Sequence, residues 1–140
     1  MKNGNPCLCA NLRSAARAIT DLFNEELRAS GLLITQFSTL AEAKRLEGPG
    51  IAELARSVGL ERTTLTRNLK VLQSMGYVVV SGHVGKTQSV KVTKKGDAAL
   101  AAGGPLWLKA QQKIAHLLGK RLSADILEIK QILDTAAGPT

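Results

Sequence analysis

The stretch ERTTLTRNLK, from Glu61 to Lys70, combines a helical pattern of leucines with many hydrogen-bonding side chains. Leu65 and Leu69 are spaced by one helical turn, so they share a face of a helix predicted over Glu61–Ser74. The threonines and basic residues fall on other faces of that helix. Threonine is only a middling helix former, so helix propensity does not explain its frequency here. We therefore predict that this helix presents a polar surface to a partner.

The segments around this stretch extend the pattern to a winged helix-turn-helix. A short helix is predicted over Ile51–Val58, and Gly59 ends it. Tyr77–Val80 is β-branched and aromatic, and Ser89–Thr93 alternates, so the two segments form a predicted hairpin around Gly82 and Gly85. Helix, short turn, helix and basic hairpin in this order are typical of DNA-binding proteins.

The positive charge of the chain is concentrated in the same region. The net charge is +8, and eight basic residues but one acidic residue, Glu61, lie between Arg56 and Lys95. Such a zone indicates a polyanionic partner, and a helix fits the DNA major groove, where arginine pairs with guanine and threonine meets base edges. The alternative is an ordinary solvated helix face. The predicted contacts to double-stranded DNA are Arg62, Thr63, Thr64, Thr66, Arg67 and Lys70 in the helix, and Lys86 and Lys91 in the hairpin.

Further helices are predicted at both ends of the chain. Asn5 is expected to cap a helix from Pro6 to about Ala29, and Thr35 a helix from Gln36 to about Leu46. After the hairpin, Thr93 is expected to cap another helix.

The C-terminal helical region is predicted in pieces. Gly103-Gly104-Pro105 should interrupt or kink it, because proline lacks the N–H donor and clashes with the preceding turn. Ser123 is expected to cap a last helix that ends near Thr135. The terminal helices carry more apolar residues than one small domain can cover, which favours a homodimer.

The predicted fold class is therefore mainly α with a small β-hairpin wing: a winged helix-turn-helix plus a helical dimerisation region from both termini. The expected domains are an N-terminal dimerisation helix over residues 1–34, a DNA-binding lobe over 35–95, and C-terminal dimerisation helices over 96–140.

The chain resembles the MarR family of transcriptional regulators over nearly its whole length. The residues that carry the resemblance are NLRSAARAITDLFNEELRASGLLITQF, IAELARSVGLERTTLTRNLKVLQSMGYV, KVTKKG and PLWLKAQQKI. The resemblance implies a homodimer with interlocked terminal helices, a palindromic operator, and repression relieved by a ligand or by oxidation. It also implies a small-molecule pocket between the dimerisation helices and the DNA-binding lobe.

Two positions depart from the family pattern. The family wing usually carries Asp-x-Arg, whereas this chain has Val84-Gly85-Lys86. Lysine is a point charge rather than a planar fork, so weaker minor-groove reading is expected. The recognition helix begins with Glu61, which is a poorer N-cap than aspartate or serine.

Cys7 and Cys9 are the only cysteines, and they are predicted to lie in the first turn of the first helix. Three interpretations remain open: redox sensors near Arg13, inert side chains at the dimer interface, or ligands of a soft metal. A disulfide between them would be strained in a regular helix, so oxidation is expected to join two subunits instead.

Family resemblance adds one further point about the cysteines. In its hydroperoxide-sensing branch the reactive cysteine precedes an arginine of the first helix by eight residues, as Cys9 precedes Arg17. The tyrosines that activate that cysteine are replaced by Arg13, Phe23 and Ile34. Cys9 is therefore a candidate only.

Other function classes find little support in the sequence. No histidine lies near either cysteine, and no phosphate-binding loop, carboxylate pair or metal motif is present, so neither an enzyme nor a cofactor is expected. A DNA-packaging protein without sequence preference remains an alternative.

No apolar run approaches the roughly 20 residues that cross a bilayer, and the N-terminus has no signal-peptide core, so a cytoplasmic protein without membrane contact is expected. The effector, whether oxidant, small molecule or metal, is left open.

Overall fold

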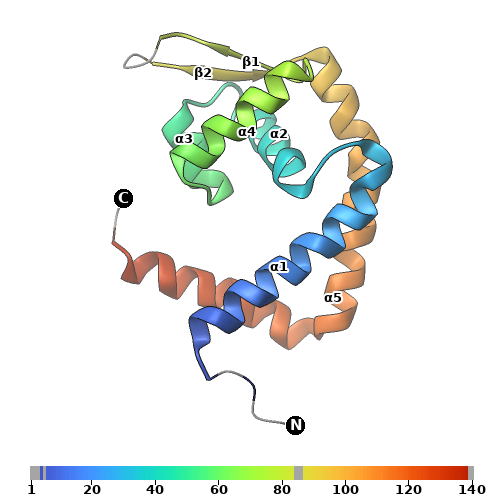
Figure 1. Ribbon diagram of the computed structural model, residues 1–140, viewed down its shortest axis with the longest axis vertical. Coiled ribbons are helices and arrows are strands. Elements are labelled where there is room, and N and C mark those ends of the chain that lie inside the picture. Colours follow the sequence, from blue (N-terminus) through green and yellow to red (C-terminus); the bar gives the residue numbers. More distant parts are fainter. Residues whose placement is uncertain (1–3, 5, 84–86, 139–140) are drawn as a thin grey trace.

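A computed structural model describes residues 4, 6–83 and 87–138 of the chain. Its elements are α1 (Leu8–Leu27), a 3-10 turn η1 (Arg28–Ser30), α2 (Ile34–Arg45), α3 (Ile51–Val58), α4 (Arg62–Ser74), β1 (Val78–Ser81), β2 (Ser89–Val92) and α5 (Lys94–Ala136). The strands pair antiparallel, with Val78 opposite Val92. Figure 1 shows α2, α3, α4 and the hairpin gathered in one lobe, while α1 and most of α5 extend away from it. The predicted fold class is confirmed.

The leucine face of α4 forms the centre of the lobe. Leu65 and Leu72 are fully buried, and Leu69 is nearly so. They pack with buried residues of α2, α3 and the hairpin, including Leu40, Leu54 and Val90. Burying these side chains removes apolar surface from water, and this burial fixes the position of α4. The helix-turn-helix of α3 and α4 therefore stands where the leucine spacing predicts it.

Two of the predicted helix starts are wrong. α1 begins at Leu8 after Cys7, not at Pro6, and Asn5 lies outside the described residues. α2 begins at Ile34, so Thr35 lies inside its first turn. The Asn24 Oδ1 atom of α1 accepts a hydrogen bond from the Ile34 N–H at 2.8 Å, and Gln36 Oε1 accepts one from the Leu33 N–H at 2.9 Å. These two side chains, rather than Thr35, satisfy N–H groups at the start of α2. The expected cap of α5 is confirmed, because Thr93 Oγ1 accepts from the Gly96 N–H at 3.0 Å.

The predicted interruption at Gly103-Gly104-Pro105 is also wrong. The backbone stays helical there, and the non-helical residue within α5 is Gly119 (φ 73°, ψ 172°). Gly103 is buried, and a Cβ on it would lie 2.9 Å from the Phe37 ring, so this glycine allows α5 to approach α2 closely. The Phe37 ring stacks on Trp107 at 6.2 Å between centroids. Ser123 lies inside α5 rather than at an N-cap, because its Oγ donates to the Gly119 carbonyl at 2.8 Å.

The two neighbouring glycines of α5 should respond oppositely to alanine. Gly103→Ala is expected to lower the free energy of unfolding by about 1–3 kcal/mol, because the new methyl group meets the Phe37 ring. Gly104→Ala is expected to raise it by up to about 1 kcal/mol, because nothing lies within 4 Å of the added atom and alanine favours the helix. Urea unfolding followed by circular dichroism measures both. Equal effects of the two substitutions would contradict the close approach of α5 and α2.

Helix α1 packs against the middle of α5. Glu26 of α1 pairs with Lys113 and, at 3.4 Å, with Lys109 of α5. The hydrogen bond from Lys113 and the charges of both lysines hold the pKa of the Glu26 carboxyl below its usual value. No helix within the described part of the chain is long and apolar enough to cross a membrane.

Candidate nucleic-acid interface

One exposed face of α4 gathers most of the predicted DNA contacts. Arg62, Thr63, Thr66, Arg67 and Lys70 line a shallow depression of about 410 Å³. All five residues are exposed, whereas Leu65, Leu69 and Leu72 of the same helix are buried. Their donors are exposed to solvent, and two guanidinium groups lie among them. This surface can donate hydrogen bonds to base edges and phosphates.

The other predicted contacts lie elsewhere or are not described. Thr64 is exposed on α4 but does not line the depression. Lys91 of β2 lines a second depression of about 230 Å³ together with Lys44 and Asp97, which form an ion pair at 2.8 Å. Lys86, and with it the wing position that departs from the family pattern, lies outside the described residues. The structure thus brings five of the eight residues together.

Sequence reasoning missed the role of Asn68 in positioning α4. Its Nδ2 donates to the Thr39 hydroxyl at 3.0 Å and to the Thr35 carbonyl at 3.2 Å, both on α2. Thr39 is fully buried, and its hydroxyl donates in turn to the Thr35 carbonyl at 2.7 Å. These bonds set the rotation of α4 about its own axis, and the spacing of the leucines gives no sign of them.

A second polar contact joins α2 and α3. Glu42 of α2 accepts hydrogen bonds from Arg45, with Nε at 3.0 Å, and from the Ser57 hydroxyl of α3. The Arg45 hydrogen bond, followed by that of Ser57, holds the pKa of the Glu42 carboxyl below its usual value. The carboxylate therefore stays ionised at neutral pH. Its hydrogen bond with Ser57 connects α2 to α3, the first helix of the helix-turn-helix.

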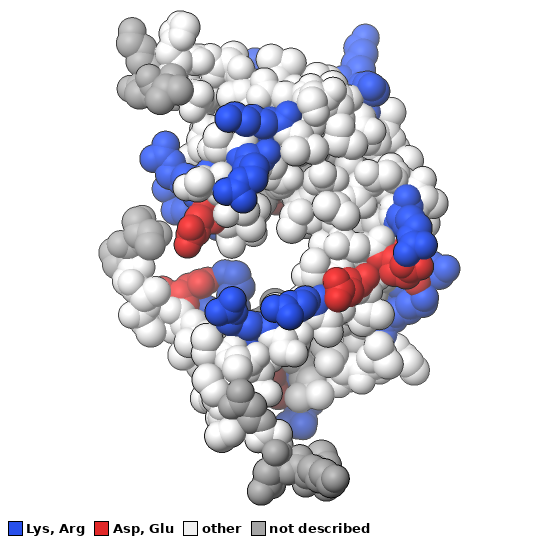
Figure 2. Space-filling view, viewed as in Figure 1, with Lys and Arg blue, Asp and Glu red and all other residues white. Residues whose placement is uncertain are grey.

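The surface charge agrees with the clustering of donors. Figure 2 shows basic side chains gathered over the lobe that contains α3 and α4, and others along α1.

Glu61, the residue before α4, makes no side-chain capping bond. This agrees with the expectation that glutamate is a poorer N-cap than aspartate or serine.

Both cysteines are exposed near the start of α1. Cys7 precedes the helix with extended backbone, whereas Cys9 lies inside it, so the prediction that both lie in the first helical turn is half right. They line a depression of about 380 Å³ whose other members are Ala10, Arg13, Ser14 and Arg17. Among the described residues, no group of three or more His, Cys, Asp and Glu could hold a metal ion.

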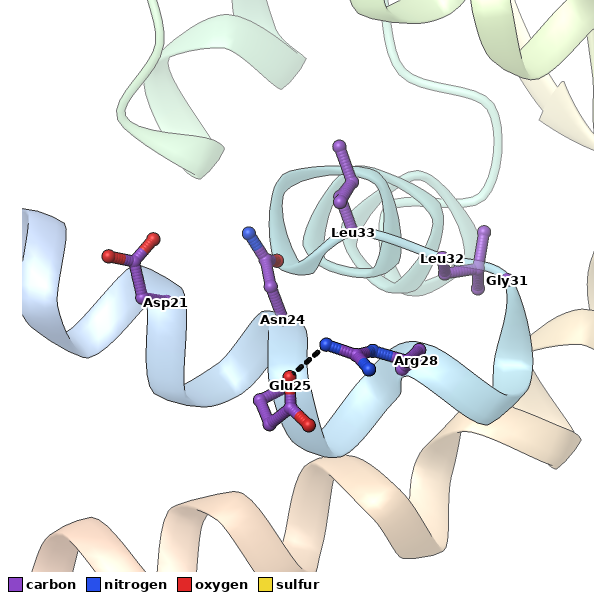
Figure 3. A pocket seen from close by; sticks show the side chains of 7 residues that line it. All are labelled: Asp21, Asn24, Glu25, Arg28, Gly31, Leu32 and Leu33. Atoms are coloured by element: carbon purple, nitrogen blue, oxygen red, sulfur yellow. Dashed lines mark hydrogen bonds and ion pairs between the residues drawn. The ribbon is translucent and has the colours of Figure 1, made fainter.

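A further hollow of about 500 Å³ lies where α1 meets the start of α2 (Figure 3). Its lining residues are Asp21, Asn24, Glu25, Arg28, Gly31, Leu32 and Leu33. Arg28 pairs with Glu25, and the Asn24 carbonyl oxygen already accepts from the backbone of α2. The hollow lies between α1 and the start of α2, and it combines charged groups with the half-exposed Leu33.

Together, a recognition helix with clustered donors, a preceding helix and a basic hairpin define a winged helix-turn-helix DNA-binding protein. The family model described as the MarR family matches residues 32–85. The crystal structure of the M. tuberculosis transcriptional regulator MosR is 38% identical, with a TM-score of 0.84 over 94% of this chain and 98% of that chain. The chain therefore belongs to the MarR family and is a DNA-binding transcriptional regulator.

Two other structures extend the comparison. The M. tuberculosis regulator MosR in complex with DNA is 38% identical, with a TM-score of 0.81 over 93% of this chain and 98% of that chain. The structure of Bordetella bronchiseptica BpsR, whose DNA binding is regulated by 6-hydroxynicotinic acid, has a TM-score of 0.82. It is 16% identical over 96% of this chain and 98% of that chain, which shows the shared fold alone. Comparison with curated proteins gave no match. The family consists of regulators, consistent with the expectation that the chain is not an enzyme.

Proposed function

We propose that the chain is a cytoplasmic, homodimeric repressor that binds a palindromic operator through one α4 helix per subunit. The observation that carries this proposal is the single exposed face on which Arg62, Thr63, Thr66, Arg67 and Lys70 lie together. Arginine and threonine can read base edges there, and Lys70 adds charge toward phosphate. The DNA complex of a regulator that is 38% identical supports the same use of this fold.

Exposed apolar side chains on the terminal helices support the dimer. In one chain these large residues are 41–79% exposed, which is a costly arrangement in water unless another surface covers them. They are Leu8, Leu12 and Leu22 of α1, and Leu108, Leu117, Leu122, Ile126, Leu127, Ile129, Ile132 and Leu133 of α5. In this arrangement residues 1–34 and 96–140 hold the dimer together, and residues 35–95 bind DNA.

Thiol oxidation at Cys7 and Cys9 is the proposed signal that releases DNA. Both thiols are exposed to oxidant, and they line one depression together with Arg13 and Arg17. Because Cys7 stands outside the helix, the strain argument against a bridge within one subunit does not hold. A small molecule is the second candidate effector, supported by the hollow between α1 and α2.

Fluorescence anisotropy tests the function directly. The labelled duplex is taken from upstream of the protein's own gene, a scrambled duplex serves as control, and light scattering gives the mass of the protein. We expect a dimer that prefers the upstream duplex by at least about 10³-fold. Equal affinity for both duplexes with a steep salt dependence would instead identify a packaging protein.

Oxidation is expected to abolish this preference through the cysteines. Stoichiometric hydroperoxide should release wild-type protein from the operator, and a dithiol should restore binding. The variant with both Cys7→Ser and Cys9→Ser should bind DNA with or without oxidant, because no thiol remains in the chain. Non-reducing electrophoresis distinguishes a bridge within a subunit from one between subunits. If the wild type ignores oxidant, the redox proposal fails and the small-molecule candidate takes its place.

A further inference from the structure

We propose that Gly119 is a specificity-determining residue of this regulator. It forms a corner in the backbone that sets the distance between the two recognition helices of a dimer, and thereby the half-site spacing that the dimer selects. The inference rests on the proposed homodimer and goes beyond it, because it assigns operator geometry to a residue far from the DNA-contacting face.

The backbone conformation of Gly119 produces the corner in α5. Gly119 has φ 73° and ψ 172°, a conformation that is essentially restricted to glycine, and it is the non-helical position within the described length of α5. Figure 1 shows the chain turning in this part of α5, so that its last segment runs in a different direction and crosses α1 in that view. Ser123 Oγ donates to the Gly119 carbonyl at 2.8 Å, so the corner has a side-chain hydrogen bond of its own.

The segment before the corner is fixed to the DNA-binding lobe. At its start, Gly96 is buried, and a Cβ there would come within 2.2 Å of the Tyr77 carbonyl. Further along, Gly103 lies against Phe37 of α2. Both close approaches leave the backbone of α5 little room to move relative to the lobe. The first part of this arm is therefore closely packed against the lobe.

The segment after the corner carries a large part of the apolar face that the partner must cover. Leu122, Ile126, Ile129, Ile132 and Leu133 are 41–58% exposed there. Gly119 thus joins the arm of α5 that contacts the DNA-binding lobe to the segment of α5 that carries these exposed residues. The direction of one arm relative to the other determines where each recognition helix stands in the dimer.

A small change in the backbone angle at Gly119 becomes a large displacement at the far end of the arm, where the DNA-binding lobe lies. The arm from Lys94 to Leu118 is about 37 Å long at 1.5 Å per residue. A change of about 10° at its end moves the other end by roughly 6 Å. Successive base pairs are about 3.4 Å apart, so such a change corresponds to nearly two base pairs of half-site spacing.

The chain contains a matched control for this corner. Gly104 and Gly119 are both partly buried in α5, and neither has an atom within 4 Å of an added Cβ. They differ in backbone conformation, because Gly104 is helical and Gly119 is not. Gly119→Ala therefore favours a straight helix, whereas Gly104→Ala only strengthens an existing one.

The test measures the affinity of each variant for a series of duplexes. The series keeps the two half-sites of the wild-type operator and varies the spacer between them by single base pairs. Wild type and Gly104→Ala should prefer the same spacer. Gly119→Ala should prefer another spacer, or lose at least about tenfold affinity at the wild-type spacer while binding a scrambled duplex as before. An unchanged spacer profile in Gly119→Ala would overturn the inference.

A second variant covers the case in which Gly119→Ala does not fold or dimerise. Ser123→Ala removes the hydrogen bond to the Gly119 carbonyl without adding an atom, and it should broaden the spacer profile. A profile as sharp as that of wild type would then overturn the inference. If wild type itself has no spacer preference, the palindromic operator of the proposed function fails as well, and that result is distinct from a failure confined to the Gly119 variant.

Discussion

Operator selectivity is expected to collapse when Arg62 and Arg67 are both replaced by alanine. The two guanidinium groups line the same depression on α4, and a bidentate contact to guanine contributes about 1–3 kcal/mol of discrimination. Loss of both contacts should reduce the affinity ratio of operator to scrambled duplex by about 10²-fold or more. Binding to the scrambled duplex should fall much less, because phosphate contacts from lysines and the backbone remain. Anisotropy titrations at fixed salt measure both affinities.

Arg121→Ala is a control for the loss of a surface arginine outside α4. Arg121 is an exposed arginine of α5 that faces Asp125 at 3.7 Å, so its removal changes the net charge without touching α4. The affinity ratio of operator to scrambled duplex should stay as in wild type. An equal loss on both duplexes in the α4 variant would show that Arg62 and Arg67 contact phosphates rather than bases.

Leu65→Ala is expected to destabilise the chain far more than substitutions at the exposed positions of α4. Leu65 has no exposed surface and lies in the core cluster beneath the polar face of the helix. Truncating a fully buried leucine removes about 2–5 kcal/mol from the free energy of unfolding, because a cavity remains where the side chain packed. This is a large part of the stability of a small domain. Urea unfolding followed by circular dichroism gives the value.

Val71→Ala in the same helix provides the comparison. Val71 is 43% exposed, so its truncation should change the free energy of unfolding by no more than about 0.5 kcal/mol. If Leu65→Ala were equally mild, α4 would not be anchored by its leucine face. The affinity for DNA of any folded Leu65→Ala protein should be close to that of wild type, since the exposed donors are untouched.

Local sequence patterns predict the DNA-binding lobe well. The leucine spacing in Glu61–Ser74, the glycine after Val58 and the alternating Ser89–Thr93 segment each reflect short-range geometry. The cap at Thr93 depends on a contact three residues away, and the sequence predicts it for the same reason. The polar face of α4 follows from helical periodicity, so the spacing of residues alone groups five of the proposed DNA contacts on one surface.

Other features depend on contacts between residues that are distant in sequence, and local patterns do not predict them. Asn24 caps α2 from another helix, and Asn68 fixes the rotation of α4 through Thr39. Gly103 permits a close approach to Phe37 instead of breaking α5, while Gly119 turns the helix at a point where no proline marks it. A glycine in a sequence signals conformational freedom, but it does not say whether packing or a turn uses that freedom. Helical periodicity therefore predicts which face of α4 is polar and free to meet DNA, whereas packing determines how that face is held and directed.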